Sequence, residues 1–181
     1  MDQAILDSIQ AQLRSPFLDV FMTFVTHLGD FALIWFVIAL ILIAQPRYRL
    51  YGVAVIVAVI ATALIGMFVL KPLFGRVRPF IAHDFMGLLI PPPSGTSFPS
   101  NHSMVSFAAA AAICCLPKGS RAVTAVKVGA VVCAMLIAFS RIYLYVHYPT
   151  DIIGGAIIGI ALGIASVWAV KRLWPPKKHV T

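Results

Sequence analysis

The hydrophobicity pattern of the chain is dominated by long apolar stretches separated by short polar segments. Five stretches have the length and composition of membrane-spanning helices, at about 17–44, 50–70, 101–117, 122–145 and 151–171. Ahead of them, Ile5, Ile9 and Leu13 recur every four residues among polar neighbours, which predicts an interfacial helix over 1–14. The pattern therefore predicts an all-α fold, a polytopic transmembrane helix bundle with five spans and an N-terminal interfacial helix.

The first apolar stretch has two possible structures. At about 1.5 Å per residue, one helix over 17–44 would be roughly 42 Å long, which exceeds a hydrocarbon core of about 30 Å. It is either a tilted helix or a short helix that breaks at Gly29-Asp30 before the span proper, which would make six spans. Within it, we interpret His27 and Asp30 as a polar pair satisfied inside the bundle, in preference to a substrate contact.

Gly155, Gly159 and Gly163 repeat along one face of the last stretch. Small residues at this spacing allow helices to approach closely in lipid. We therefore assign these glycines to helix packing.

Composition supports an integral membrane protein. The chain has 181 residues, of which 61% are hydrophobic and 11% charged, whereas a soluble domain carries about a quarter charged residues. This length fits a single domain, residues 1–181. The net charge of +8 does not indicate nucleic-acid binding, because the basic residues lie mostly at the ends of apolar stretches and not on one soluble face.

The charged residues also predict an orientation. With five spans, nine basic residues fall on one side: Arg47, Arg49, Lys118, Arg121, Lys127, Lys171, Arg172, Lys177 and Lys178. The positive-inside rule makes this side, and with it the C-terminus, cytoplasmic. All six acidic residues fall on or near the other side, together with five basic residues, Arg14, Lys71, Arg76, Arg78 and Arg141. Cations held there against the topological preference need another reason, and a bound anion supplies one.

Three polar clusters lie on this outer side. They are Lys71 with Arg78-Pro79, then Pro99-Ser100-Asn101-His102, and then Ser140-Arg141 with His147 and Asp151. Each cluster alone has an ordinary structural explanation, as interfacial anchors or as helix caps. Together they bring three fixed cations, two histidines and one carboxylate to one membrane face, an inventory that suits an oxyanion such as phosphate.

These residues resemble the three signature motifs of the type-2 phosphatidic acid phosphatase superfamily. The motifs are Lys71-x6-Arg78-Pro79, Pro99-Ser100-Asn101-His102 and Ser140-Arg141-x5-His147-x3-Asp151, in the family's order and with its spacing. The resemblance covers residues 71–151 directly, and the flanking spans suit the family's helical bundle. Asn101 is a departure, because many members have glycine at this position.

The resemblance implies a role for each matched residue. His147 would be the nucleophile that forms a phosphohistidine, Asp151 would orient and activate it, and His102 would protonate the leaving oxygen and then help activate water. The phosphate-binding residues would be Lys71, Arg78, Ser100, Asn101 and Arg141. Arg76 and His83 are candidates for contacts to a second phosphate or a headgroup. No metal and no other cofactor is expected, because fixed cations can neutralise the phosphoryl charge.

Two subgroups of the superfamily share further local sequence with this chain. Residues 78–83, 88–91 and 97–100 resemble bacterial undecaprenyl-diphosphate phosphatases, which regenerate the carrier lipid of cell-wall synthesis. The segment Thr26-His27-Leu28-Gly29 resembles phosphatidylglycerophosphate phosphatases instead. We expect undecaprenyl diphosphate as the substrate, with phosphatidylglycerophosphate or phosphatidic acid as the alternative.

A non-catalytic anion-binding membrane protein or a transporter is the alternative from another functional class. A transporter places polar groups near the bilayer midplane, often in repeated halves. Here the polar groups cluster at one face, and the sequence contains no internal repeat. We therefore expect a multi-pass enzyme of a bacterial inner membrane, with its active site facing the periplasm or exterior and a membrane lipid phosphate as its partner.

Overall fold

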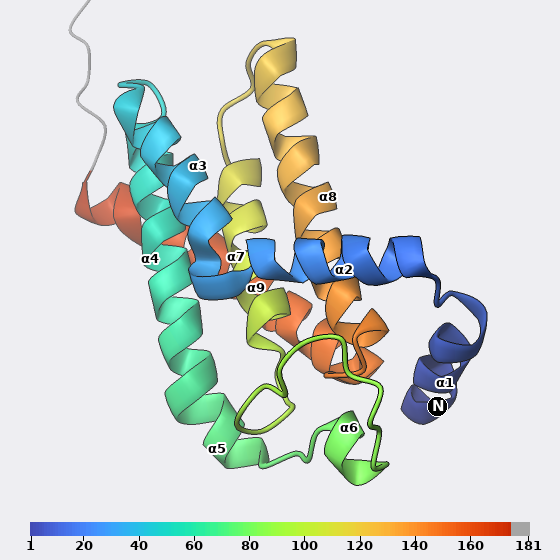
Figure 1. The fold of residues 1–181 in the computed structure, drawn as a ribbon. Helices are drawn as coiled ribbons and strands as arrows, with labels where there is room; N and C mark the ends of the chain where they lie inside the picture. Colours follow the sequence, from blue (N-terminus) through green and yellow to red (C-terminus); the bar gives the residue numbers. More distant parts are fainter. Residues whose placement is uncertain (175–181) are drawn as a thin grey trace, which may run out of the picture.

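The computed structural model describes residues 1–174, which form helices joined by loops (Figure 1). In chain order they are α1 (Asp2–Gln12), α2 (Pro16–Leu28), the 3-10 turn η1 (Asp30–Ala32), α3 (Leu33–Ala44), α4 (Arg49–Ile65), the π-helical turn η2 (Gly66–Leu70), α5 (Lys71–Phe74), α6 (Pro79–Ala82), α7 (Asn101–Cys114), α8 (Arg121–Tyr143) and α9 (Pro149–Leu173). These residues contain no strand, so the predicted all-α class is confirmed for the described part of the chain.

α7 is the central helix of the bundle and packs against α4, α8 and α9. The glycines of α9 allow its close approach. A Cβ atom on Gly159 would lie 2.2 Å from the backbone oxygen of Met104, and one on Gly163 would lie 2.3 Å from that of Ala108. The predicted packing role of these glycines is confirmed, and it fixes α7, whose first turn carries His102, firmly against α9.

The stretch 17–44 is broken, so the single tilted helix is the wrong alternative. Ser15 caps α2, because its hydroxyl accepts a hydrogen bond from the backbone N–H of Leu18 at 3.3 Å. α2 and α3 meet at a bend of 52°. At the bend, Phe31 and Ala32 have φ values of +52° and +57°, a left-handed conformation that cannot continue an α-helix. In Figure 1, α2 crosses in front of α7 and α8, whereas α3 runs beside α4.

The number of spans differs from the expectation. Three segments are long and apolar enough to cross a membrane: Arg49–Ala82, Arg121–Tyr143 and Pro149–Leu173. The bent pair of α2 and α3 makes four if it is counted as one span. α7 has 14 residues, or about 21 Å at about 1.5 Å per residue, which is shorter than a hydrocarbon core of about 30 Å. The described residues therefore support three to four spans, and the count of five remains a prediction.

The predicted N-terminal helix is present as α1, but its buried face differs from the predicted stripe. Leu6 is completely buried, with Tyr145 and Tyr148 in the same apolar cluster, and Ile9 is also buried. Ile5 and Leu13 remain exposed, at 40% and 45% of their surface. α1 thus packs on the loop between α8 and α9 through Leu6 and Ile9, and its position in the membrane interface remains a prediction.

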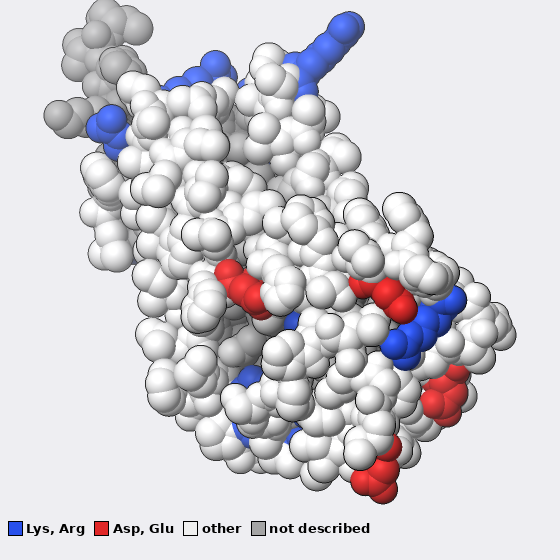
Figure 2. All heavy atoms as spheres, in the orientation of Figure 1, with Lys and Arg blue, Asp and Glu red and all other residues white. Residues whose placement is uncertain are grey.

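Charge is divided between the two halves of the molecule. Figure 2 shows basic side chains at the end that carries the α3–α4 connection and the start of α8, and acidic side chains only in the other half of this view. In that second half, a group of basic side chains is exposed beside acidic ones, and a few more basic atoms lie inside a hollow. Lys177 and Lys178 of the predicted cytoplasmic group lie outside the described residues. The division agrees with the predicted topology, and the identity of the cytoplasmic side remains a prediction.

Candidate active site

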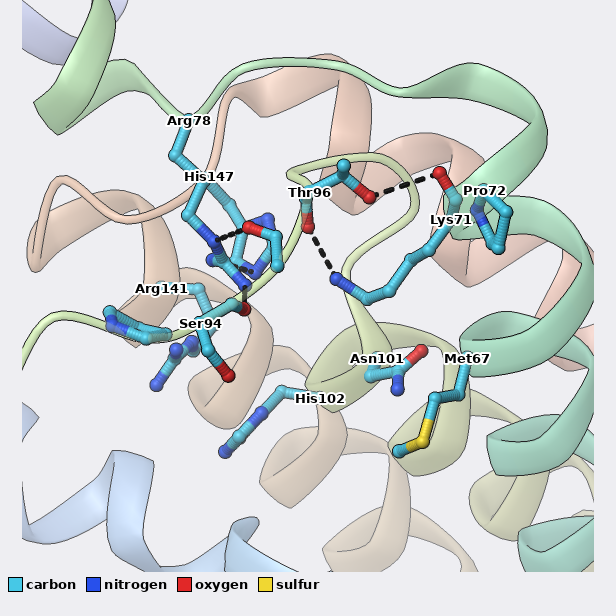
Figure 3. A pocket seen from close by; sticks show the side chains of 12 residues that line it. Met67, Lys71, Pro72, Arg78, Ser94, Thr96, Asn101, His102, Arg141 and His147 are labelled. Atoms are coloured by element: carbon cyan, nitrogen blue, oxygen red, sulfur yellow. Dashed lines mark hydrogen bonds between the residues drawn. The ribbon is translucent and has the colours of Figure 1, made fainter.

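A cavity of about 460 Å³ lies where the three polar clusters meet (Figure 3). Its lining residues come from η2, α5, α7 and α8, from the segment between α5 and α6, and from the loops before α7 and after α8: Met67, Lys71, Pro72, Arg78, Pro93, Ser94, Gly95, Thr96, Asn101, His102, Arg141 and His147. Six of the eight residues predicted as catalytic or phosphate-binding are in this lining. The other two, Ser100 and Asp151, lie behind it and are completely buried.

His147 lies in the short loop between α8 and α9 and is only 2% exposed. Its Nδ1 is 3.5 Å from Oδ2 of Asp151 and 3.4 Å from the hydroxyl of Ser97. A terminal guanidinium nitrogen of Arg78 lies 3.1 Å from Nε2. Because arginine can only donate, Nε2 must accept, and the ring proton is therefore on Nδ1, toward Asp151. This tautomer leaves a lone pair on the nitrogen beside Arg78.

Asp151 caps α9 and lies beside His147. It lies in the first turn of α9, after Pro149, and its Oδ2 accepts a hydrogen bond from the backbone N–H of Tyr148 at 2.9 Å. The same oxygen accepts the hydroxyl of Ser97, and Oδ1 accepts a guanidinium N–H of Arg76 at 2.7 Å. The carboxylate is thus fixed from three directions and faces the imidazole of His147.

Burial lowers the pKa of His147 below its ordinary value, and the positive charges of Arg78 and Arg141 act in the same direction. The hydrogen bond to Asp151 opposes both effects. With its pKa lowered, the imidazole is neutral at pH 7, and only the neutral ring has a lone pair that can attack.

Two of the cations are held by backbone carbonyls of the loop 91–100. Arg78 donates to the carbonyl of Gly95 at 2.9 Å. It also donates to the carbonyl of Ser94 at 3.0 Å, which Figure 3 shows. Lys71 donates to the carbonyl of Thr96, whose hydroxyl donates back to the carbonyl of Lys71 at 3.1 Å. These bonds fix the side chains without neutralising their charge.

Arg141, the third cation, is 4% exposed and donates to the hydroxyl of Thr26 at 2.6 Å. Its Nε is buried and has no hydrogen-bond partner within residues 1–174. In the same range, no carboxylate oxygen lies within 4.0 Å of the charged nitrogens of Lys71, Arg78 or Arg141. Three buried or half-buried cations without a carboxylate partner are a charge arrangement that suits an anion.

His102 enters the cavity from the first turn of α7 (Figure 3). Its Nε2 is 3.0 Å from Oδ1 of Asp30, and Oδ2 of the same carboxylate is 2.7 Å from Nδ1 of His27. His27 and Asp30 do form the predicted pair, but their side chains are 55% and 40% exposed, so the pair does not lie inside the bundle as predicted. The prediction also missed the contact of Asp30 with a proposed catalytic residue. The one feature of the sequence that could have indicated this contact was a carboxylate, Asp30, inside an apolar stretch.

Besides Asp151, three predicted residues are not part of the cavity lining. The hydroxyl of Ser100 accepts the backbone N–H of Ser103 at 3.4 Å and caps α7. Arg76 is bonded to Asp2 and Asp151, at 2.8 and 2.7 Å, and does not reach the cavity. His83 is exposed at the end of α6. The phosphate or headgroup contacts expected of these three residues remain predictions, and their positions do not favour them.

Comparison with known proteins agrees with this geometry. The family model described as the PAP2 superfamily matches residues 51–175. The chain is 35% identical over 156 residues to phosphatidylglycerophosphatase B of Bacillus subtilis, covering 83% of this chain and 74% of that protein. It is 28% identical over 146 residues to an undecaprenyl-diphosphatase of Sulfolobus acidocaldarius, covering 80% of this chain and 67% of that protein.

A solved structure has the same fold. The crystal structure of a transmembrane PAP2-type phosphatidylglycerolphosphate phosphatase from Bacillus subtilis superposes with a TM-score of 0.77 at 29% identity, covering 95% of this chain and 85% of that one. The family match includes all three polar clusters, and the long apolar helices are those of a membrane protein. The chain therefore belongs to the PAP2 (type-2 phosphatidic acid phosphatase) superfamily, as its three motifs predicted.

Proposed function

We propose that the protein is a metal-independent lipid phosphatase that works through a phosphohistidine on His147. One observation carries this proposal: Nδ1 of His147 faces a buried carboxylate, while Nε2 lies at a cavity that holds cations without carboxylate partners. A nucleophile that is oriented by a neighbouring carboxylate and lies beside fixed positive charges is the arrangement that phosphoryl transfer requires.

In the first step, the lone pair on Nε2 of His147 attacks phosphorus. The bond between phosphorus and the leaving oxygen breaks, and its electron pair goes to that oxygen, which takes a proton from His102. Asp151 stabilises the positive charge that develops on the ring of His147. Lys71, Arg78 and Arg141 neutralise the phosphoryl oxygens, the role that Mg²⁺ has in kinases.

In the second step, water attacks the phosphohistidine. His102, now neutral, accepts a proton from the water as its oxygen bonds to phosphorus. The bond between phosphorus and nitrogen breaks, its electron pair returns to Nε2, and inorganic phosphate leaves. Both histidines are then in their starting protonation states, so the cycle is complete.

A second cavity supports a substrate with an apolar tail. It has a volume of about 380 Å³ and shares Met67, Asn101 and His102 with the first cavity. The rest of its lining is apolar and comes from the α2–α3 break and from α3, α4 and α7. A phosphate in the first cavity, attached to a hydrocarbon chain in the second, would use both.

Among lipid phosphates we favour undecaprenyl diphosphate, hydrolysed at the outer membrane face. The local resemblance of residues 78–83, 88–91 and 97–100 supports this choice, as does the similarity to an undecaprenyl-diphosphatase. Phosphatidylglycerophosphate is the second candidate, favoured by the segment 26–29 and by the similarity to the Bacillus subtilis enzyme.

The test is phosphate release by the purified protein in detergent and EDTA, with undecaprenyl diphosphate, phosphatidylglycerophosphate and phosphatidic acid as separate substrates. We expect release without metal, fastest from the diphosphate, and none above background from His147→Ala with an unchanged size-exclusion profile. Equal release by His147→Ala would refute the nucleophile. Comparable rates on all three lipids would refute the substrate preference but not the phosphatase.

A further inference from the structure

We propose that Asp30 is a positioning residue for His102 and that the break between α2 and α3 exists to place it. The inference rests on the proposed function, because it requires His102 to be the proton donor. It adds a residue that lies outside all three motifs and more than forty positions before the first of them.

The contact itself is direct. Oδ1 of Asp30 lies 3.0 Å from Nε2 of His102, and only about a fifth of the His102 side chain is exposed, at 21%. A carboxylate at Nε2 keeps that nitrogen protonated and leaves Nδ1 as the nitrogen for proton transfer. Nδ1 of His102 has no hydrogen-bond partner in the part of the chain that the structure describes. His102 therefore has one ring nitrogen held by protein and one available to a ligand.

The backbone at the break is what brings the carboxylate to α7. Phe31 and Ala32, directly after Asp30, both have positive φ values, at +52° and +57°. Consecutive left-handed residues with β-carbons are unfavourable, and they persist where the surrounding structure requires them. The apolar composition of 17–44 would otherwise allow a continuous helix. The break gives η1 its contact with α7 and directs Asp30 at His102.

Gly29 gives an independent indication that this segment is shaped around the imidazole. A Cβ atom at position 29 would lie 2.7 Å from Cδ2 of His102 and 2.9 Å from Cγ2 of Ile137. The ring of His102 therefore packs directly on the backbone of Gly29. Two consecutive residues at the break thus contact the same ring, Gly29 by packing and Asp30 by a hydrogen bond.

The chemical consequence depends on the leaving group. Asp30 would stabilise the imidazolium of His102 before it gives its Nδ1 proton to the leaving oxygen, and would hold the neutral ring for the proton of the attacking water. An alkoxide leaves slowly unless it is protonated, whereas a nitrophenolate leaves readily without a proton. Loss of a positioning carboxylate should therefore slow the first turnover of an alkyl phosphate and spare that of a nitrophenyl phosphate. A purely structural role would affect both substrates alike.

The experiment compares the first turnover of Asp30→Asn with that of wild type, on dioctanoyl phosphatidic acid by rapid quench and on 4-nitrophenyl phosphate by stopped flow. On the lipid we expect a rate about 10- to 100-fold lower, with KM within about threefold of wild type. On the nitrophenyl ester we expect a burst of normal rate, followed by slow turnover because water activation also uses His102. Asp30→Glu, which keeps the carboxylate, should recover part of the lipid rate.

His27→Asn is the matched control, because His27 contacts the other oxygen of Asp30 and not His102. It should leave both first turnovers within about threefold of wild type. Equal slowing of both substrates by Asp30→Asn, or no slowing of either, would overturn the inference. His102→Ala and His147→Ala measured beside it separate the two proposals. If both alanine variants lack activity while Asp30→Asn keeps the wild-type first turnover on the lipid, only the role of Asp30 fails. If His147→Ala remains active, the proposed function itself fails.

Discussion

Two histidine–carboxylate pairs face the same cavity, but they are constructed in different ways. His147 and Asp151 are four residues apart at the start of α9, are both almost completely buried, and are fixed by Ser97, Arg76 and a backbone N–H. His102 and Asp30 are 72 residues apart and join α7 to the break between α2 and α3. Asp30 is also far more open, with 40% of its side chain exposed.

The difference matches the demands on each histidine. A nucleophile must attack from one fixed direction, which a rigid, water-excluded surrounding provides. A residue that donates a proton to the leaving group and then receives one from water needs contact with both substrate and solvent. His102 lines both cavities, whereas His147 lines only the first of the two. We therefore expect changes near His147 to affect every substrate, and changes near His102 to depend on the leaving group.

Among changes to the residues that surround the two histidines, Asp151→Asn should have the largest effect. An amide can donate a hydrogen bond to Nδ1, which would move the ring proton of His147 to Nε2 and remove the attacking lone pair. We expect kcat for phosphate release to fall by about 10² to 10⁴ on lipid and nitrophenyl substrates alike. A loss below about tenfold would show that the carboxylate does not set the tautomer. Thermal unfolding of the variant controls for its loss as a cap of α9.

Gly29→Ala should have the next largest effect, and it tests the pair of His102 and Asp30. The new Cβ would push the ring of His102 out of place, and misplacement by about 1 Å can lower a rate by up to about 100-fold. We expect kcat on lipid to fall by about 10- to 100-fold with KM nearly unchanged. Gly129→Ala on α8 is the matched control, because a Cβ there has no neighbour within 4 Å and activity should not change. Equal kcat values for the two variants would contradict the packing argument.

Arg76→Gln distinguishes two roles for one arginine. Arg76 contacts Asp151 and does not line the cavity. Removing its guanidinium should therefore loosen the pair of His147 and Asp151 and lower kcat by about tenfold for every lipid. If Arg76 instead contacted a second phosphate, KM for undecaprenyl diphosphate would rise while phosphatidic acid hydrolysis stayed unchanged. Steady-state kinetics on the two lipids separate these outcomes.

Ser97→Ala should have the smallest effect. Its hydroxyl donates to Asp151, but the carboxylate keeps its bonds to Arg76 and to the backbone of Tyr148. We expect kcat to fall by only about threefold, the equivalent of one neutral hydrogen bond in a redundant set. A loss as large as that of Asp151→Asn would mean that the pair depends on one contact and is not rigid.

The local parts of the active site could be predicted from sequence, and the distant parts could not. The spacing of His147 and Asp151 matched a motif, and Asp151 fell at the start of the predicted span 151–171. The partners of the cations were not predictable, because Arg78 and Lys71 are held by backbone carbonyls of the loop 91–100, and a carbonyl has no sequence signature. Ser97 was missed for a similar reason, since a lone serine is ordinary in such a loop.

The membrane class, the all-α fold and the motif residues that carry the proposed chemistry could all be predicted from the sequence. This was possible because hydrophobic periodicity and residue type act locally along the chain. The helix packing, by contrast, was needed to show that the first apolar stretch breaks, that Asp30 contacts His102, and that Arg76 and Ser100 lie behind the cavity. These outcomes depend on how helices pack in space, and that packing brings together residues whose separation along the chain carries no signal.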